Sequence, residues 1–191
     1  MALPTPSAST KNMTESSGSS DGNSDPQDIV RPGGDAHDLS YQGDRGLDVF
    51  VRDVASASPL AVMELERHGV PAKIMGDLAR RMELPVARLF EIVKIPRSTA
   101  LRKVAASTCI DGSAGLTIIG IIRLLGIARR IVDESAPESE RDFDTIKWFA
   151  QWIEQPQPAL GGSSPAEFLD TPTGISMIAQ MLGAMQSGAY V

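Results

Sequence analysis

The chain has 191 residues, of which 42% are hydrophobic and 22% are charged, and its formal net charge is −6. This length predicts one domain of ordinary size or two small ones. Cys109 is the only cysteine, which excludes an intramolecular disulfide and fits a reducing cytoplasm, although a secreted protein without disulfides also has this composition. We expect no signal peptide at the start and no membrane span, because the longest apolar stretch, residues 114–128, contains Arg123 and is shorter than the roughly 20 residues required.

Residues 1–46 differ in composition from the remainder of the chain. Ser, Gly, Pro and Asp fill 24 of these positions, and seven acidic residues against three basic ones give a charge of −4. Such a segment buries too little apolar surface to offset its loss of conformational entropy, so we predict a disordered N-terminal tail. An untethered leader and an arm that folds on a partner both fit this pattern.

From Leu47 onward, apolar residues recur at the three- and four-residue spacing of helices. A helix is expected to begin at Leu47, another at Ser58-Pro59, and a third at Pro71. Two shorter helices are expected over residues 85–93 and 97–106. A long helix should then run over residues 113–134.

The C-terminal part continues this helical pattern after a charged loop over residues 135–141. A helix that contains Trp148 and Trp152, both expected in the core, must end at Pro156 and Pro158 because proline does not fit a helix interior. A capping-box turn follows at Ser164, and a last helix should run from Thr171-Pro172 to about Gln186. Alternating strand patterns are absent, which predicts an all-α fold.

Basic and acidic residues are distributed unevenly along the chain. Residues 71–107 carry eight basic and three acidic side chains, a local charge of +5. Residues 133–170 carry nine acidic and two basic ones, a local charge of −7, and the last 21 residues carry no charged side chain. The basic segment could neutralise DNA phosphates, whereas the acidic segment would be repelled by them. A merely solvated surface is the alternative interpretation.

Residues 86–107 have the pattern of a helix-turn-helix. Pro96 is expected at the first position of the second helix, where its missing N–H is no loss. In this motif the second helix lies in the major groove, and its N-terminal residues reach the base edges. The residues expected to pack inward are Leu89, Phe90, Val93 and Ile95, and then Leu101, Val104 and Ala105. The candidate DNA-binding residues are Arg88, Lys94, Arg97, Ser98, Thr99, Arg102 and Lys103, with Arg88 and Lys103 assigned to phosphates.

The Arg97-Ser98-Thr99 sequence at the head of the second helix resembles the Xre/Cro class of repressors. That class often has glycine in the turn, where this chain has Lys94, so the turn must accommodate a side chain. Two short packing helices without a DNA role are the alternative.

The C-terminal third consists of a Trp-containing helix, a proline pair, a Leu-Gly-Gly turn, a Ser-Pro-x-Glu turn and a final helix. This order resembles the toxin-binding domain of the Xre/MbcA/ParS antitoxins, the partners of RES-type toxins, and the resemblance spans roughly residues 60–191. The matching positions are Trp152, Pro156, Leu160, Gly161, Gly162, Pro165, Leu169, Thr171, Gly174, Leu182, Gly188 and Tyr190.

The resemblance implies an antitoxin with a DNA-binding and dimerisation region over residues 47–112 and a toxin-binding domain over residues 113–191. The implied toxin is an NAD glycohydrolase or a mono-ADP-ribosyltransferase, and the antitoxin covers its active-site cleft. The helix-turn-helix would repress the shared operon, and a homodimer or a hetero-oligomer with the toxin is expected. The family often carries Arg and Glu near the chain end, where this sequence has Ala184 and Gln186, so we expect a more apolar contact.

The last helix has Met177, Met181 and Met185 at four-residue spacing, a stripe that fits either a partner surface or the core. The candidate toxin-binding residues are Met181, Met185, Gln186, Ser187, Gly188, Ala189, Tyr190 and Val191. We hypothesise that the tail enters the toxin's NAD cleft, with the Tyr190 ring and the Val191 carboxylate in place of nucleotide groups.

The sequence does not favour an enzyme. His37 lies in the predicted tail, His68 lies at a helix end, and Cys109 has no metal-ligand spacing around it. We therefore expect no catalytic residue, no metal and no cofactor. Two rival hypotheses are a free-standing transcription regulator whose second half senses a ligand or partner, and a helical adaptor without a DNA role.

Overall fold

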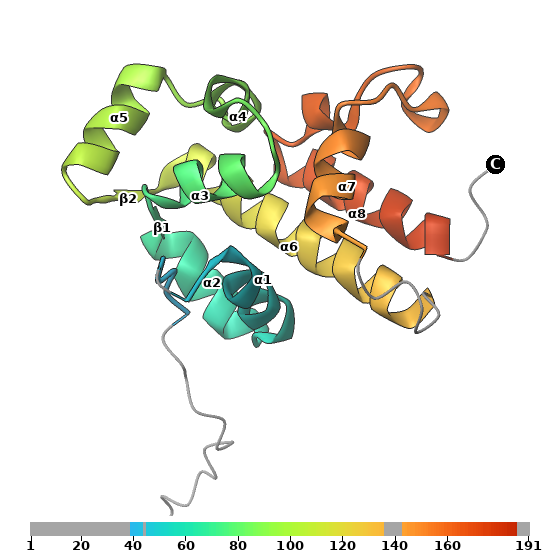
Figure 1. Cartoon of the computed structure of the whole chain (residues 1–191), viewed down its shortest axis with the longest axis horizontal. Helices are drawn as coiled ribbons and strands as arrows, with labels where there is room; N and C mark the ends of the chain where they lie inside the picture. The colour runs from blue at the N-terminus through green and yellow to red at the C-terminus, as the bar shows by residue number, and fades with distance from the viewer. Residues whose placement is uncertain (1–38, 44, 136–142, 187–191) are drawn as a thin grey trace, which may run out of the picture. The chain divides into compact units, whose positions relative to one another are not determined.

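A computed structural model describes residues 39–43, 45–135 and 143–186 of the chain (Figure 1). The elements in chain order are α1 (Leu47–Ser56), α2 (Pro59–His68), β1 (Val70–Pro71), α3 (Ile74–Arg81), α4 (Val86–Val93), α5 (Arg97–Ala105), β2 (Cys109–Ile110), α6 (Gly112–Ser135), α7 (Thr145–Ile153), the 3-10 turns η2 (Pro158–Leu160) and η3 (Pro165–Phe168), and α8 (Pro172–Gln186). The all-α expectation is confirmed. None of the described helices combines the length and apolar character that a membrane span requires.

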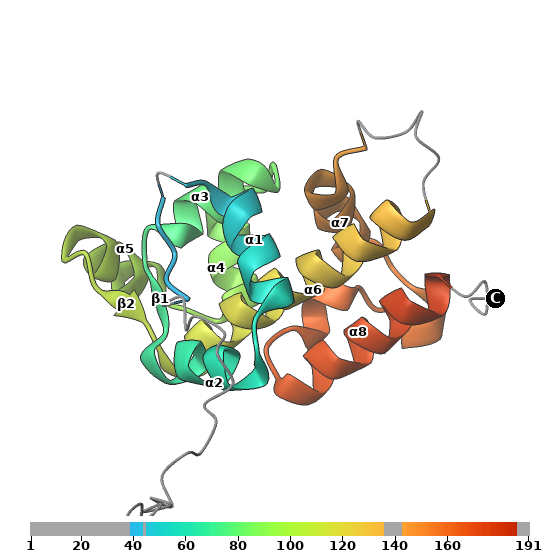
Figure 2. The ribbon, with the colours of Figure 1, turned by 90° about the horizontal axis from the view of Figure 1, so that it is seen from below.

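The long helix α6 lies at the centre of the described structure. Its side chains from Ile118 to Leu125 include six Ile and Leu residues that are fully buried, whereas Leu116, Arg123 and Arg130 form a narrow exposed stripe. A helix with so wide an apolar face must be covered by other elements on most of its sides. Helices α1 and α2 cover one side of α6 and α7 and α8 cover another, and Figure 2 shows α8 alongside α6.

Two glycines of α6 allow neighbouring helices to approach its backbone closely. A Cβ atom on Gly126 would lie 2.8 Å from the Cβ of Ala55 in α1, and one on Gly120 would collide with the side chain of Ile175 in α8. Glycine permits this kind of close approach because it has no side chain. The sequence of α6 therefore fixes its distance to helices from both halves of the chain.

A short antiparallel ladder, which the sequence analysis did not predict, joins β1 to β2. Val70 pairs with Ile110 and Pro71 pairs with Cys109. Pro71 is therefore a strand residue and the expectation that it begins a helix is wrong, since α3 begins at Ile74. Proline is tolerated in such a peripheral strand, and two residues are too few to show an alternating pattern.

The boundary of the predicted tail needs a correction. Residues 1–38 and 44 lie outside the described residues, as do residues 136–142 of the predicted charged loop. Tyr41, however, is only 2% exposed and packs edge-on against Phe50 of α1, so the tail does not extend to Gly46. Its hydroxyl donates a 2.6 Å hydrogen bond to Asp77, and burial together with this bond raises the pKa of Tyr41.

Arg81 at the end of α3 connects three helices through its guanidinium group. It donates to Asp48 of α1 at 2.9 Å and to Asp144, the N-cap of α7, at 2.8 Å. Burial by itself raises the pKa of Asp144, but the hydrogen bonds from Arg81 and from backbone N–H groups of α7, together with the charge of Arg81, leave that pKa below its ordinary value. The pair is partly exposed, so it orients α7 more than it stabilises the fold.

We predict that Leu124→Ala, which opens a cavity in the buried surface of α6, lowers the free energy of unfolding by about 2–5 kcal/mol. The matched control is Leu60→Ala, because Leu60 is 64% exposed and its truncation should change stability by less than about 0.5 kcal/mol. Urea unfolding followed by tryptophan fluorescence measures both changes. Equal losses in the two variants would contradict the central role of α6.

Candidate functional site

Helices α4 and α5 form the predicted pair of short helices joined by a tight turn. Helix α4 buries Leu89, Phe90, Ile92 and Val93, and Ile95 in the turn is 7% exposed. Pro96 is the N-cap of α5, one position before the expected one. The two short helices and the turn between them thus lie where the sequence pattern predicts them.

Lys94 forms the turn in a left-handed backbone conformation, with φ 56° and ψ 36°. This conformation is unfavourable for a residue with a Cβ atom, which explains why related turns carry glycine. The turn therefore accommodates the Lys94 side chain by accepting backbone strain. The side chain itself is exposed and lies close enough to the Glu167 carboxylate to lower that group's pKa.

Helix α5 exposes most of its surface. Ala100 is its one fully buried side chain, and the helix contacts α4 and β2 along a narrow strip. The expectation that Leu101 and Val104 pack inward is wrong, because they are 51% and 41% exposed, and Ala105 is exposed as well. Figure 1 shows α5 at the edge of the structure, at the end opposite to α8.

The candidate DNA-binding residues fall into two groups. Arg97, Ser98 and Arg102 are exposed on α5, and Thr99 is half-buried. Among the described residues, Arg97 and Arg102 make no ion pair with a carboxylate. Arg97, Arg102 and Lys94 are thus exposed cations of α5 and the turn before it.

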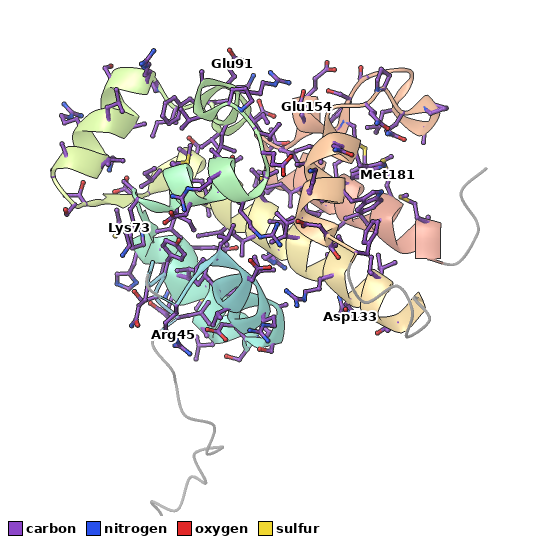
Figure 3. The ribbon with its side chains drawn as sticks, viewed as in Figure 1. Arg45, Lys73, Glu91, Asp133, Glu154 and Met181 are labelled. Atoms are coloured by element: carbon purple, nitrogen blue, oxygen red, sulfur yellow. The ribbon has the colours of Figure 1, made fainter. Side chains whose placement is uncertain are left out.

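Arg88 instead faces inward to the C-terminal part of the chain. Its Nε and Nη2 donate to the two oxygens of Glu154 at the end of α7, both at 3.0 Å, and Nη1 donates to Glu91 at 2.9 Å. These hydrogen bonds raise the pKa of Arg88. Figure 3 labels both carboxylates. With its guanidinium group satisfied in this way, Arg88 connects α4 to α7 and is not available to a phosphate.

Lys103 also has partners within the chain. Its ammonium group donates to the backbone carbonyl of Cys109 at 2.7 Å and to Asp111 at 3.1 Å, which lowers the pKa of Asp111. These contacts attach the C-terminal end of α5 to β2. Sequence reasoning missed this role because nothing in the spacing of charges shows which ones meet.

The C-terminal region begins with the aromatic helix α7. Phe149 is fully buried and Trp152 is 6% exposed, so the expected core role of Trp152 is confirmed. Trp148 is half-buried and stacks on Trp152 with ring centroids 6.0 Å apart. Phe143, 47% exposed, lies 6.2 Å from the Trp148 ring.

The turns between α7 and α8 follow the pattern read from the sequence. Gly161 and Gly162 have positive φ angles of 64° and 88°, and Ser164 and Glu167 form the predicted capping box. The Ser164 backbone N–H and hydroxyl donate to Glu167 and lower its pKa. A Cβ atom on Gly174 would collide with the carbonyl of Phe168, so only glycine fits in this position of α8.

Helix α8 turns one face to the core and another outward. Ile178 and Leu182 are buried, and Met181 is only 9% exposed and belongs to the core. The expectation that Met181 forms part of a toxin surface therefore needs correction, whereas Met185 is half-buried at the edge of the core. The exposed residues of α8 are Pro172, Thr173, Ser176, Gln180 and Gly183. The side chain of Gln186 and residues 187–191, also expected to bind the toxin, lie outside the described residues.

Comparisons with known proteins bear on this C-terminal region. Residues 142–188 match the family model of the antitoxin Xre/MbcA/ParS C-terminal toxin-binding domain. The chain is also 29% identical over 135 residues to a protein named Prs ADP-ribosylating antitoxin from Sphingobium sp. (strain YBL2), an alignment that covers 70% of this chain and 83% of the relative. Both similarities support an antitoxin of the Xre/ParS type.

The antitoxin's matched region corresponds to α7, η2, η3 and α8, together with the residues just before α7. This assignment favours an antitoxin over a free-standing regulator with a ligand-sensing second half. Helix α6 precedes the match, although it packs against both α7 and α8. The region that matches the toxin-binding domain therefore packs on a helix that the match does not include.

We predict that Lys94→Gly stabilises the antitoxin by about 1 kcal/mol, because glycine adopts the left-handed conformation of this turn without strain. Lys94→Ala is the control, since it removes the charge and keeps the strained backbone. Urea unfolding of the three proteins measures the difference. A Lys94→Gly variant no more stable than Lys94→Ala would show that the turn is not strained.

Proposed function

We propose that this antitoxin blocks the active site of a RES-type toxin that consumes NAD or transfers its ADP-ribose group. The match of residues 142–188 to a toxin-binding domain carries the proposal. The contact would be made by α8, including Met185 and Gln186, and by residues 187–191. We further propose that the antitoxin acts in the cytoplasm and represses its own operon through α5.

The outward face of α8 supports this role. Its exposed residues Thr173, Ser176 and Gln180 are short or uncharged, and a Cβ atom on Gly183 would meet open space. No side chain from Thr171 to Val191 carries a charge. A partner can approach such a helix closely without removing water from an unpaired charge, which is the main cost of burying charged groups.

The class of toxin is supported by the relative from Sphingobium. Its name contains ADP-ribosylation, a modification whose donor is NAD. An inhibitor of such an enzyme must prevent NAD from entering or reacting. Residues 187–191, which follow α8 and have no charged side chain, could fill the nucleotide cleft, with Tyr190 as the largest side chain.

We predict that deletion of residues 188–191 weakens inhibition of the toxin at least about tenfold, because the deletion removes the segment that fills the cleft. Purified RES-type toxin encoded beside the antitoxin gene would be titrated with each antitoxin variant, and the rate of NAD loss would be measured.

Gln180→Arg serves as the companion variant, since it places a long charged side chain on the outward face of α8. Inhibition that survives the deletion but not Gln180→Arg would assign the contact to α8 alone. Full inhibition by both variants would contradict the proposed binding surface.

The proposal of DNA binding rests on the exposed cations of α5. Arg97 is the first residue of α5 and Arg102 is the sixth, in the helix that would lie in the major groove of a helix-turn-helix complex. Arginine can bind guanine with two hydrogen bonds. The self-association that we propose would present two such helices to half-sites about one DNA turn apart.

We predict that Arg97→Ala and Arg102→Ala each lower the affinity for the operon's promoter about tenfold, because each removes a cation that faces DNA. Arg52→Ala is the matched control, since Arg52 is exposed on α1 and the charge change is the same. Fluorescence anisotropy at several salt concentrations gives the affinities, and the slope of log affinity against log salt should be shallower by about 0.9 for each lost phosphate contact. Equal effects of all three variants would indicate attraction by net charge alone.

A further inference from the structure

Helix α5 displays two large apolar side chains in addition to its cations. Leu101 is 51% exposed and Val104 is 41% exposed, and their three-residue spacing puts them on the same side of the helix. Arg97 lies four residues before Leu101 on that side. The outward row Arg97, Leu101 and Val104 thus combines a cation with apolar surface.

The orientation of this row is fixed by contacts at both ends of α5. Ala100 is fully buried and Ile95 fills the turn before the helix. At the other end, Lys103 donates to the carbonyl of Cys109 and to Asp111. The exposure of Leu101 is therefore a consequence of how α5 is attached, and any partner meets a helix that is already held in place.

The charges around the row indicate what kind of partner it fits. Helix α5 has no acidic residue, and Arg97 and Arg102 make no ion pair among the described side chains. The partner should therefore be an anion that also offers small apolar groups. The major groove of duplex DNA has both, because phosphates line it and the C5-methyl group of thymine projects into it.

We propose that Leu101 is a sequence-reading residue whose side chain packs on the C5-methyl group of a thymine in the major groove. This inference rests on the DNA binding proposed above and adds the base that α5 selects. Leu101 lies at the middle of α5, one turn beyond Arg97, on the helix expected to enter the major groove. Val104 lies one turn further along the same row and extends the apolar contact toward the sugar-phosphate backbone.

The experiment combines a protein variant with DNA duplexes that lack a single thymine methyl group. Wild-type antitoxin and Leu101→Ala are each titrated against the promoter duplex and against duplexes in which one thymine at a time is replaced by deoxyuridine. That replacement removes the methyl group and keeps the base pair. We expect one position at which deoxyuridine lowers wild-type affinity about three- to tenfold.

Leu101→Ala should lower the affinity for the natural duplex by a similar factor and be insensitive to deoxyuridine at that position. Such non-additivity identifies a direct contact between the two groups. Leu60→Ala is the matched control, because it makes the same change at an exposed site on α2 and should leave both affinities unchanged. Circular dichroism verifies that each variant is folded.

The outcomes separate this inference from the proposed function. If Arg97→Ala weakens binding while Leu101→Ala and every deoxyuridine leave affinity unchanged, DNA binding stands and thymine reading is overturned. If wild-type antitoxin binds no promoter duplex, both are overturned. If Leu101→Ala changes toxin inhibition or self-association but not DNA affinity, the row is a protein contact and the inference is likewise overturned.

Discussion

Helix α6 is buried on all but one narrow stripe, and the helices that bury it come from both halves of the chain. Helices α1 and α2 lie against one side and α7 and α8 against another, with Gly126 and Gly120 at the points of closest approach. A buried apolar helix gains its stability from these neighbours, and each neighbour hides its own apolar face in return. The DNA-binding and toxin-binding parts proposed for this antitoxin therefore share one core, and a boundary at residue 113 would divide that core.

Several of the cations in the basic segment, residues 71–107, are occupied by ion pairs within the chain. Arg81 and Arg88 bind carboxylates from distant parts of the chain, and Lys103 binds Asp111 and a backbone carbonyl. Partly exposed pairs of this kind add little stability, but they set orientation. The cations that remain for a ligand are concentrated on α5 and its turn. The surface that we propose for DNA is thus narrower than the charge of residues 71–107 suggests.

The local elements could be predicted because their signals are local. Periodicity, caps and prolines located α4, α5, the capping box at Ser164 and the start of α8. Long-range partners leave no such signal, so the ladder between β1 and β2 and the burial of Tyr41 were missed. The same reason explains the errors at the candidate sites. The sequence shows that a helix has an apolar face, but it does not show whether another element covers that face. Met181 is covered and belongs to the core, whereas Leu101 is uncovered and lies on the surface.

The position of Met181 constrains how α8 can act. Because Ile178, Met181 and Leu182 are buried, a toxin that binds α8 as we propose would meet the opposite face and the half-buried edge at Met185. That face offers hydroxyl, amide and glycine surface, and Ala184 stands where related antitoxins often carry a charged residue. Contact with such a surface depends on close fit between the two backbones more than on individual charged pairs. Specificity for one toxin would then come from shape along α8 and from the sequence of the segment that follows it.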